Sequence, residues 1–261
     1  MFSGETPCVY EKNQLGEVLC QLRYPEIAAI SERIPVEFQE ALRQTFPRYE
    51  FRQESPPPRI ADEPGNLRVE NLPARPLYSY ASEDNGWRVT LTGTSICLSC
   101  RHYTDWAEFA GKLDRPLAAL IGIYHPVYFE RIGLRYMNFI SRRDLGLSDV
   151  PFRKLIQSRH LGLLSDPEVN EAALNRATAD TEMKLPGGCR VKLHTGTGLL
   201  QIGKNLDREV KFIFDQDLFL PGKIPAPMVA AVLQMLHKHA WSIFRDAITD
   251  RLHEAMEPEE N

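Results

Sequence analysis

The chain has 261 residues, of which 43% are hydrophobic and 25% are charged, and its formal net charge is −4. These proportions are those of an ordinary folded protein with one large core or two small ones. The negative balance excludes a bulk positive field that would draw the chain to nucleic acid or to a membrane. Five cysteines without a framework spacing indicate a reducing compartment. The first residues lack a signal-peptide pattern and no apolar run can span a bilayer, so we expect a soluble cytoplasmic protein.

The first half of the chain predicts a strand, a helix, a series of strands and a second helix. Residues 15–24 alternate between apolar and polar, as in a half-buried strand. Pro35 favours a helix start, and Pro47 ends that helix. "EDNGW" predicts a tight hairpin turn, because Asn85-Gly86 tolerates positive φ angles. The strands of the series are expected at residues 67–71, 77–82, 87–92 and 95–103, before a helix over residues 104–120.

The second half repeats this order. An alternating strand over residues 128–140 precedes a helix that starts at Pro151. "PGG" is expected to turn the first hairpin of the half, and "TGTG" to bend or turn the second. A closing helix over residues 226–256 would reach roughly 45 Å at the α-helical rise. The strands in between are expected at residues 172–185, 189–195 extending toward 202, and 209–219.

The tripeptide "LRY" marks the first strand of each half, beginning at Leu22 and at Leu134. We therefore predict an α+β fold built from a duplicated β-α-β(3-4)-α unit. Its antiparallel sheets would carry helices packed on one face and be related by a pseudo-two-fold axis. The first repeat would span residues 1–125, and the second, with the long C-terminal helix, residues 126–261. The alternative is one mixed α+β domain in which the order is coincidental.

Several short motifs resemble reactive sites without completing one. "GLLQIGKN" lacks the hydroxyl residue and the following helix of a P-loop, so a β-hairpin is expected there. Cys97 and Cys100 have zinc or redox spacing, but on a strand they would point to opposite faces. The "HKH" run is expected to be a solvated patch, and Asp215 and Asp217 to be ordinary loop or strand-edge residues. The sequence thus assigns no catalytic residue, no metal site and no cofactor.

Basic side chains predominate on one predicted sheet face. By alternation this face collects Arg23, Arg88, Arg101, Arg131, Arg135, Arg190, Lys192 and His194. Few carboxylates are expected beside them, Glu17 and Asp215 being the clearest. Arginine suits phosphate or carboxylate ligands, because its planar fork donates two parallel hydrogen bonds. The alternative is a solvated face with cross-strand ion pairs.

Four segments along the whole chain resemble a sporadically distributed family of bacterial and archaeal proteins of similar length. These segments are "LGEVLCQLRY", "YTDWAEF", "RIGLRYMNFI" and "FRDAITDRLHEAM". The resemblance supports the element boundaries and implies no reaction, cofactor or catalytic residue.

Three functions are therefore compatible with the sequence. The first is a non-catalytic binding or regulatory module whose basic sheet face or inter-repeat groove accepts an anionic ligand or nucleic acid. The second is an enzyme acting on a phosphorylated or nucleotide substrate. The third is a protein that binds a partner, or a second copy of itself, through the C-terminal helix, for which an exposed apolar stripe with Trp241 on that helix would be the sign.

Overall fold

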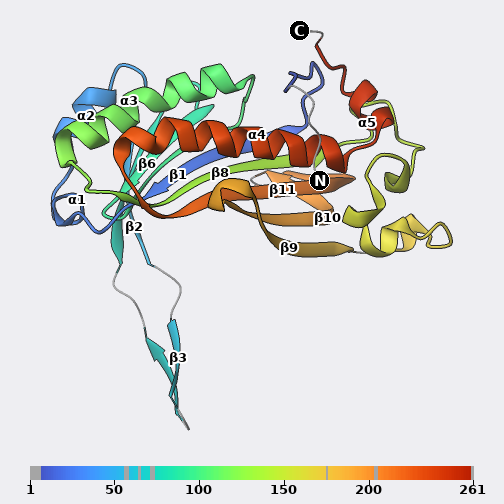
Figure 1. The fold of residues 1–261 in the computed structure, drawn as a ribbon, viewed down its shortest axis with the longest axis horizontal. Coiled ribbons are helices and arrows are strands. Elements are labelled where there is room, and N and C mark those ends of the chain that lie inside the picture. The colour runs from blue at the N-terminus through green and yellow to red at the C-terminus, as the bar shows by residue number, and fades with distance from the viewer. Residues whose placement is uncertain are drawn as a thin grey trace.

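A computed structural model describes residues 7–55, 59–63, 66–70, 74–174, 176–202 and 205–259. Most strands join one antiparallel sheet in the order β2-β5-β6-β7-β1-β8-β11-β10-β9, and β3 and β4 form a separate ribbon drawn below it in Figure 1. The strands are β1 (Leu15–Arg23), β2 (Arg48–Glu54), β3 (Arg59–Glu63), β4 (Asn66–Glu70), β5 (Arg75–Ala81), β6 (Trp87–Thr92), β7 (Ser95–Cys100), β8 (Phe129–Ile140), β9 (Thr178–Lys184), β10 (Arg190–Ile202) and β11 (Asn205–Ile224).

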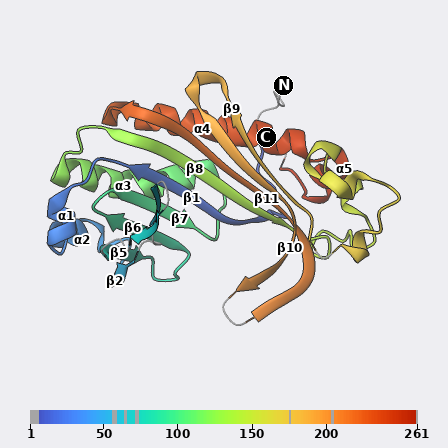
Figure 2. The same ribbon diagram turned by 90° about the horizontal axis from the view of Figure 1, so that it is seen from below.

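The two long helices cover one face of the sheet, and Figure 2 looks onto the opposite face, called the open face below. The α-helices are α1 (Ala28–Glu32), α2 (Val36–Leu42), α3 (Trp106–Tyr124), α4 (Val229–Ala247) and α5 (Asp250–Ala255). The fold is therefore α+β with a large antiparallel sheet and few helices. None of the helices in the described part of the chain is both long and apolar enough to cross a membrane.

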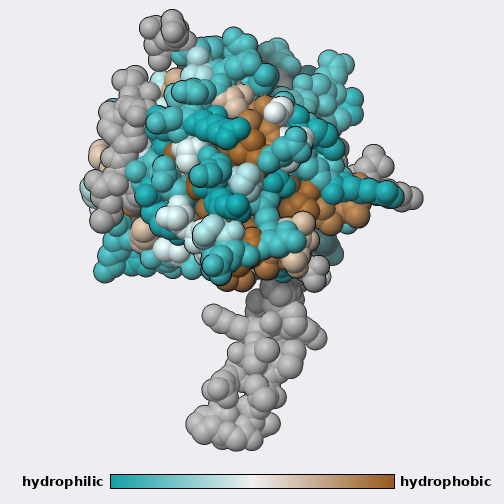
Figure 3. Space-filling model, turned by 90° about the vertical axis from the view of Figure 1, so that its right-hand side faces the viewer, coloured by the Kyte–Doolittle hydropathy of each residue, from teal (hydrophilic) through white to brown (hydrophobic). Residues whose placement is uncertain are grey.

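Alternation along the strands and helical spacing along α3 and α4 build the core between sheet and helices. On β8, Ile132, Leu134 and Tyr136 are buried under the helices, as the pattern predicts. On α4 the apolar stripe is buried against the sheet, and Trp241 packs partly against the core. At the surface, hydrophilic side chains predominate on the end that carries α5, and apolar ones gather in smaller patches (Figure 3). The expected turn at "EDNGW" is confirmed, with Asn85 at a φ of 59°.

Two predicted helices are wrong in extent or type. The segment after Pro151 forms short 3₁₀ turns, beginning with Phe152–Lys154, in place of an α-helix. Glu171 stabilises this irregular path, because its carboxylate accepts the backbone N–H of Phe152 and pairs with Arg142. The C-terminal helix breaks at Ile248, which is extended. Thr249 then caps α5, so α4 reaches only about 28 Å.

The strand predictions differ from the structure at several places. Neither β2 nor β3 is predicted from the sequence, and residues 172–174 and 176–177 precede β9 without joining it. "PGG" turns the β9–β10 hairpin as predicted, whereas "TGTG" lies within β10. The β10–β11 pair closes at Ile202 and Asn205, so the predicted hairpin is confirmed in place of a P-loop. Residues 203–204 of that motif lie outside the described residues.

Candidate functional site

The eight residues predicted for a basic face all belong to the open face. Arg23 lies on β1, Arg131 and Arg135 on β8, and Arg101 directly after β7. Arg88 lies on β6, and Arg190, Lys192 and His194 lie on β10. They are spread along and across the sheet, so they do not converge on one site.

The two arginines of β8 are held by carboxylates of the neighbouring strand β11. Arg135 donates to both oxygens of Asp215, from Nε at 2.7 Å and from Nη2 at 2.5 Å. Arg131 donates from Nη2 to both oxygens of Asp217, at 2.6 and 2.8 Å. A Cβ atom at Gly133 would lie 2.2 Å from Nη1 of Arg131, so this glycine makes room for a neighbouring guanidinium.

Three further arginines of the open face, and His194, also have carboxylate partners. These pairs are Arg88–Glu50 at 3.6 Å, Arg101–Glu17 at 3.9 Å, Arg190–Glu182 at 3.5 Å and His194–Asp180 at 2.8 Å. The expectation of few carboxylates on this face is therefore wrong, because long-range pairing brings acidic residues of β2, β9 and β11 beside the basic ones.

Arg23 and Lys192 are the members of the predicted set that have no ion pair within the described part of the chain. Three strand spacings and four residues along the strands separate them, which corresponds to about 20 Å. One phosphate cannot contact both side chains across that distance, whereas an extended polyanion can.

Cys97 and Cys100 lie on opposite sides of β7, as predicted: Cys100 is in the buried row with Ile96 and Leu98, and Cys97 faces the other way. Burial raises the pKa of the Cys97 thiol to about 12 and that of Cys100 to about 11. Both are therefore protonated at neutral pH and are weak nucleophiles. Where side chains are described, no three His, Cys, Asp or Glu residues gather as metal ligands.

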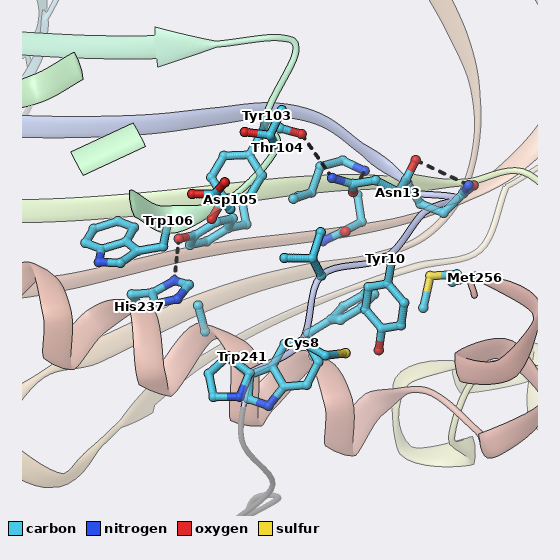
Figure 4. Close-up of a pocket in the computed structure, with 18 of the residues that line it drawn as sticks. Cys8, Tyr10, Asn13, Tyr103, Thr104, Asp105, Trp106, His237, Trp241 and Met256 are labelled. Carbon is cyan, nitrogen blue, oxygen red and sulfur yellow. Dashed lines mark hydrogen bonds between the residues drawn. The ribbon is translucent and has the colours of Figure 1, made fainter. Parts of the chain in front are cut away.

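A pocket of about 490 Å³ lies on the helix-covered side of the sheet. Its walls come from the segment before β1 with the first residue of that strand, the start of α3, helix α4, strands β8 and β11, and Met256 after α5. Figure 4 shows Tyr10, Trp106, His237 and Trp241 around it. This concave site brings together residues far apart in the sequence, and the sequence alone did not predict it.

His237 forms part of one wall and is not the solvated residue that the "HKH" run predicted. Its ring stacks on Trp106 with centroids 4.6 Å apart and an interplanar angle of 7°. Its Nδ1 lies 2.8 Å from the hydroxyl of Tyr136. Burial lowers the pKa of His237 to about 4 and raises the pKa of Tyr136. Both side chains are therefore neutral at physiological pH and are held by each other.

Two amide side chains stand among apolar neighbours at the sheet side of the pocket. Gln216 is 2% exposed and Asn138 is 4% exposed. Asn138 Nδ2 donates to the carbonyl of Phe214 at 3.3 Å. Gln216 Oε1 is buried and has no hydrogen-bond partner among the described residues. An unpaired buried acceptor costs on the order of 1–3 kcal/mol, so this atom needs an explanation.

A signal for the buried amide of Gln216 was present in the sequence. Gln216 follows Phe212 and Phe214 at a spacing of two residues, and Leu218 comes next. On an alternating strand this places a polar side chain in the buried row. The flanking Asp215 and Asp217 lie on the opposite, open face, where they pair with Arg135 and Arg131.

Comparison with known proteins adds no assignment. No family model matches the chain, and no curated protein matches it in sequence. Support for a function comes from the geometry of the pocket and of the open face.

Proposed function

We propose that this protein is a non-catalytic binding module that holds a small molecule in the pocket between the sheet, α3 and α4. The observation that carries the proposal is Gln216, which lines a space of about 490 Å³ and whose buried Oε1 has no hydrogen-bond partner among the described residues. Pockets of this size, lined by aromatic groups with a few polar atoms, are typical of small-molecule sites. The neutral Tyr136–His237 pair supports binding over acid–base chemistry at neutral pH.

Titration with N-phenyl-1-naphthylamine, a neutral dye whose fluorescence rises in apolar surroundings, tests this proposal. We expect saturable binding of one dye per chain. Ala107→Trp places a large ring at an exposed position of the pocket wall and should weaken binding at least tenfold. Ala230→Trp is the matched control, because Ala230 is exposed on α4 and does not line the pocket. Equal loss in both variants, or no saturable binding to the unaltered protein, contradicts the proposal.

The anionic partner of the open face is a second candidate function. The observation that favours it is the pair of exposed cations, Arg23 and Lys192, for which no carboxylate partner is seen in the described part of the chain. Their separation of about 20 Å suits an extended polyanion such as single-stranded nucleic acid. Combined change of both residues to alanine should abolish retention on a heparin column if this face binds polyanions, and unchanged retention contradicts it.

We also propose that the two halves are copies of one unit related by a pseudo-two-fold axis. In support, β7 adjoins β1 as β11 adjoins β8, and α3 and α4 each have 19 residues. Gln21 and Gly133 pair across the antiparallel strands β1 and β8, and Leu22 and Leu134 are the residues that follow them. A two-fold axis through the Gln21–Gly133 pair would therefore exchange Leu22 and Leu134. Superposition of residues 10–124 on 126–256 tests the proposal, and it fails if Leu22 does not fall on Leu134.

The remaining expectations stay predictions. An enzyme acting on a phosphorylated or nucleotide substrate would need a reacting group that the pocket wall does not identify. A protein contact through the C-terminal helix would use the polar side of α4, because its apolar stripe faces the sheet. We retain a cytoplasmic location as a proposal, supported by the five free cysteines.

A further inference from the structure

Building on the proposed binding function, we propose that the pocket accepts a neutral, flat aromatic molecule that donates one hydrogen bond to Gln216 Oε1. The donor would be an N–H or O–H group on the ring system. Charge, ring content and the unpaired acceptor each constrain a different property of this ligand.

The charges around the pocket favour a neutral ligand. Asp105 is the one charged residue in the described lining, and no lysine or arginine belongs to it. Its Oδ1 accepts the backbone N–H of Glu108 at 2.8 Å, which caps α3. The helix N-terminus thus already holds this carboxylate. An anion would enter without a counterion, because His237 is neutral, and burial of an unpaired charge is unfavourable.

The ring content of the lining favours an aromatic ligand. Tyr103 meets Tyr136 edge to face with centroids 5.9 Å apart, and Tyr10 lies 5.9 Å from Trp241 on another wall. Figure 4 shows rings from the segment before β1, from the start of α3 and from α4 around the same space. Aromatic pairs stabilise each other by about 0.5–1.5 kcal/mol beyond the area they bury, so a flat ring system gains from several walls at once.

Hydrogen bonding identifies where the ligand's donor would lie. The hydroxyl of Tyr136 is hydrogen-bonded to Nδ1 of His237, and the amide nitrogen of Asn138 donates to a backbone carbonyl. Gln216 lines the pocket, and its Oε1 is buried and without a partner among the described residues. For a ligand's donor to reach this oxygen, the Gln216 amide turns toward the space as the ligand enters. Because a carbonyl oxygen only accepts hydrogen bonds, the complementary group on the ligand is a donor.

A pair of isosteric probes tests this assignment. 2-Phenylindole donates an N–H bond, whereas 2-phenylbenzofuran has the same shape with an oxygen that donates none. We expect 2-phenylindole to bind at least tenfold more tightly by fluorescence titration, because the furan would leave Gln216 unpaired. Gln216→Met removes the acceptor and should bring the two affinities within about threefold. Gln21→Met, the same change on the open face, is the control and should keep the tenfold preference.

Each outcome separates this inference from the proposed function. Equal binding of both probes to the unaltered protein overturns the donor assignment and leaves the binding function standing. Failure of both probes and of the naphthylamine dye to bind overturns the function itself. Decan-1-ol donates a hydrogen bond but has no ring. We expect its dissociation constant, measured by displacement of 2-phenylindole, to be at least tenfold higher than that of 2-phenylindole. Equal dissociation constants overturn the aromatic assignment. The probe pair compared on the unaltered protein remains decisive even where Gln216→Met does not fold.

Discussion

Arg135→Ala distinguishes a structural role of the open-face arginines from a binding role. Two nitrogens of this guanidinium donate to the two oxygens of Asp215, whose side chain is 11% exposed. Removal of the guanidinium leaves that largely buried carboxylate without its counterion. Loss of one partner of an enclosed pair is more damaging than removal of both, because the remaining charge stays desolvated.

The size of the effect follows from exposure. Hydrogen bonds to charged groups contribute about 1.5–3 kcal/mol each when enclosed, whereas exposed ion pairs contribute about 0–1 kcal/mol. The Arg135 side chain is 45% exposed, so solvent screens part of the interaction. We expect Arg135→Ala to lower the free energy of unfolding by about 2 kcal/mol. Adding Asp215→Ala should recover about 1 kcal/mol of this loss, because the double change leaves no orphaned charge.

Urea unfolding at pH 7 with an unchanged denaturant slope measures these differences. Arg23→Ala is the control: it lies on the same face without an ion pair in the described chain and should stay within about 0.5 kcal/mol of the unaltered protein. The reasoning is refuted if Arg135→Ala is equally harmless while phosphate stabilises the unaltered protein and not the variant. That result would assign the guanidinium to an external anion.

Three smaller predictions concern single positions. Gly133→Ala should cost about 1 kcal/mol in urea unfolding, because its Cβ displaces the Arg131 guanidinium, and the cost should shrink in an Arg131→Ala background. The pKa of His237 is lowered to about 4 in the folded protein, so between pH 6.5 and 4 its imidazole binds a proton in the unfolded state and stays neutral in the folded state. Stability should therefore fall as pH drops from 6.5 toward 4, and less steeply in His237→Gln; parallel pH profiles contradict this. Serine at Cys97 and Cys100 should cost at most a few kcal/mol, and zinc that copurifies stoichiometrically and disappears on these changes contradicts the structural role.

Local sequence was informative wherever one face of an element is buried. The alternation around Leu134 and the helical spacing of Phe109 and Leu113 correspond to buried rows in the structure. β2 escaped prediction because all its residues are exposed, so no apolar row marks it. The prediction for the segment after Pro151 failed for a different reason: Glu171 accepts the backbone N–H of Phe152 and pairs with Arg142, and local sequence does not show these contacts.

The open face shows why a list of residue types does not predict a site. Alternation assigned Arg131 and Arg135 to one face, but the pairing register of β8 with β11 decides which groups lie beside them. That register brings Asp215 and Asp217 next to the arginines, and the sequence places these aspartates about 80 residues away. Electrostatics that depend on register cannot be read from strand patterns alone.

Buried side-chain polar atoms in the described part of the chain are paired, with two exceptions: Gln216 Oε1 in the pocket and the hydroxyl of Tyr80 elsewhere in the core. The exception at Gln216 lies where the fold leaves a space, and this connects fold to function. A methionine at position 216 could fill similar volume without an unpaired acceptor, so a chain shaped only by stability has no use for this amide. Its cost of about 1–3 kcal/mol is a large share of the 5–15 kcal/mol that typically separates folded from unfolded states. Violations of local packing rules are expected where a protein binds something. A ligand that donates to Gln216 Oε1 removes the cost on binding, so Gln216→Met should raise the stability of the free protein while it weakens the hold on the donor ligand.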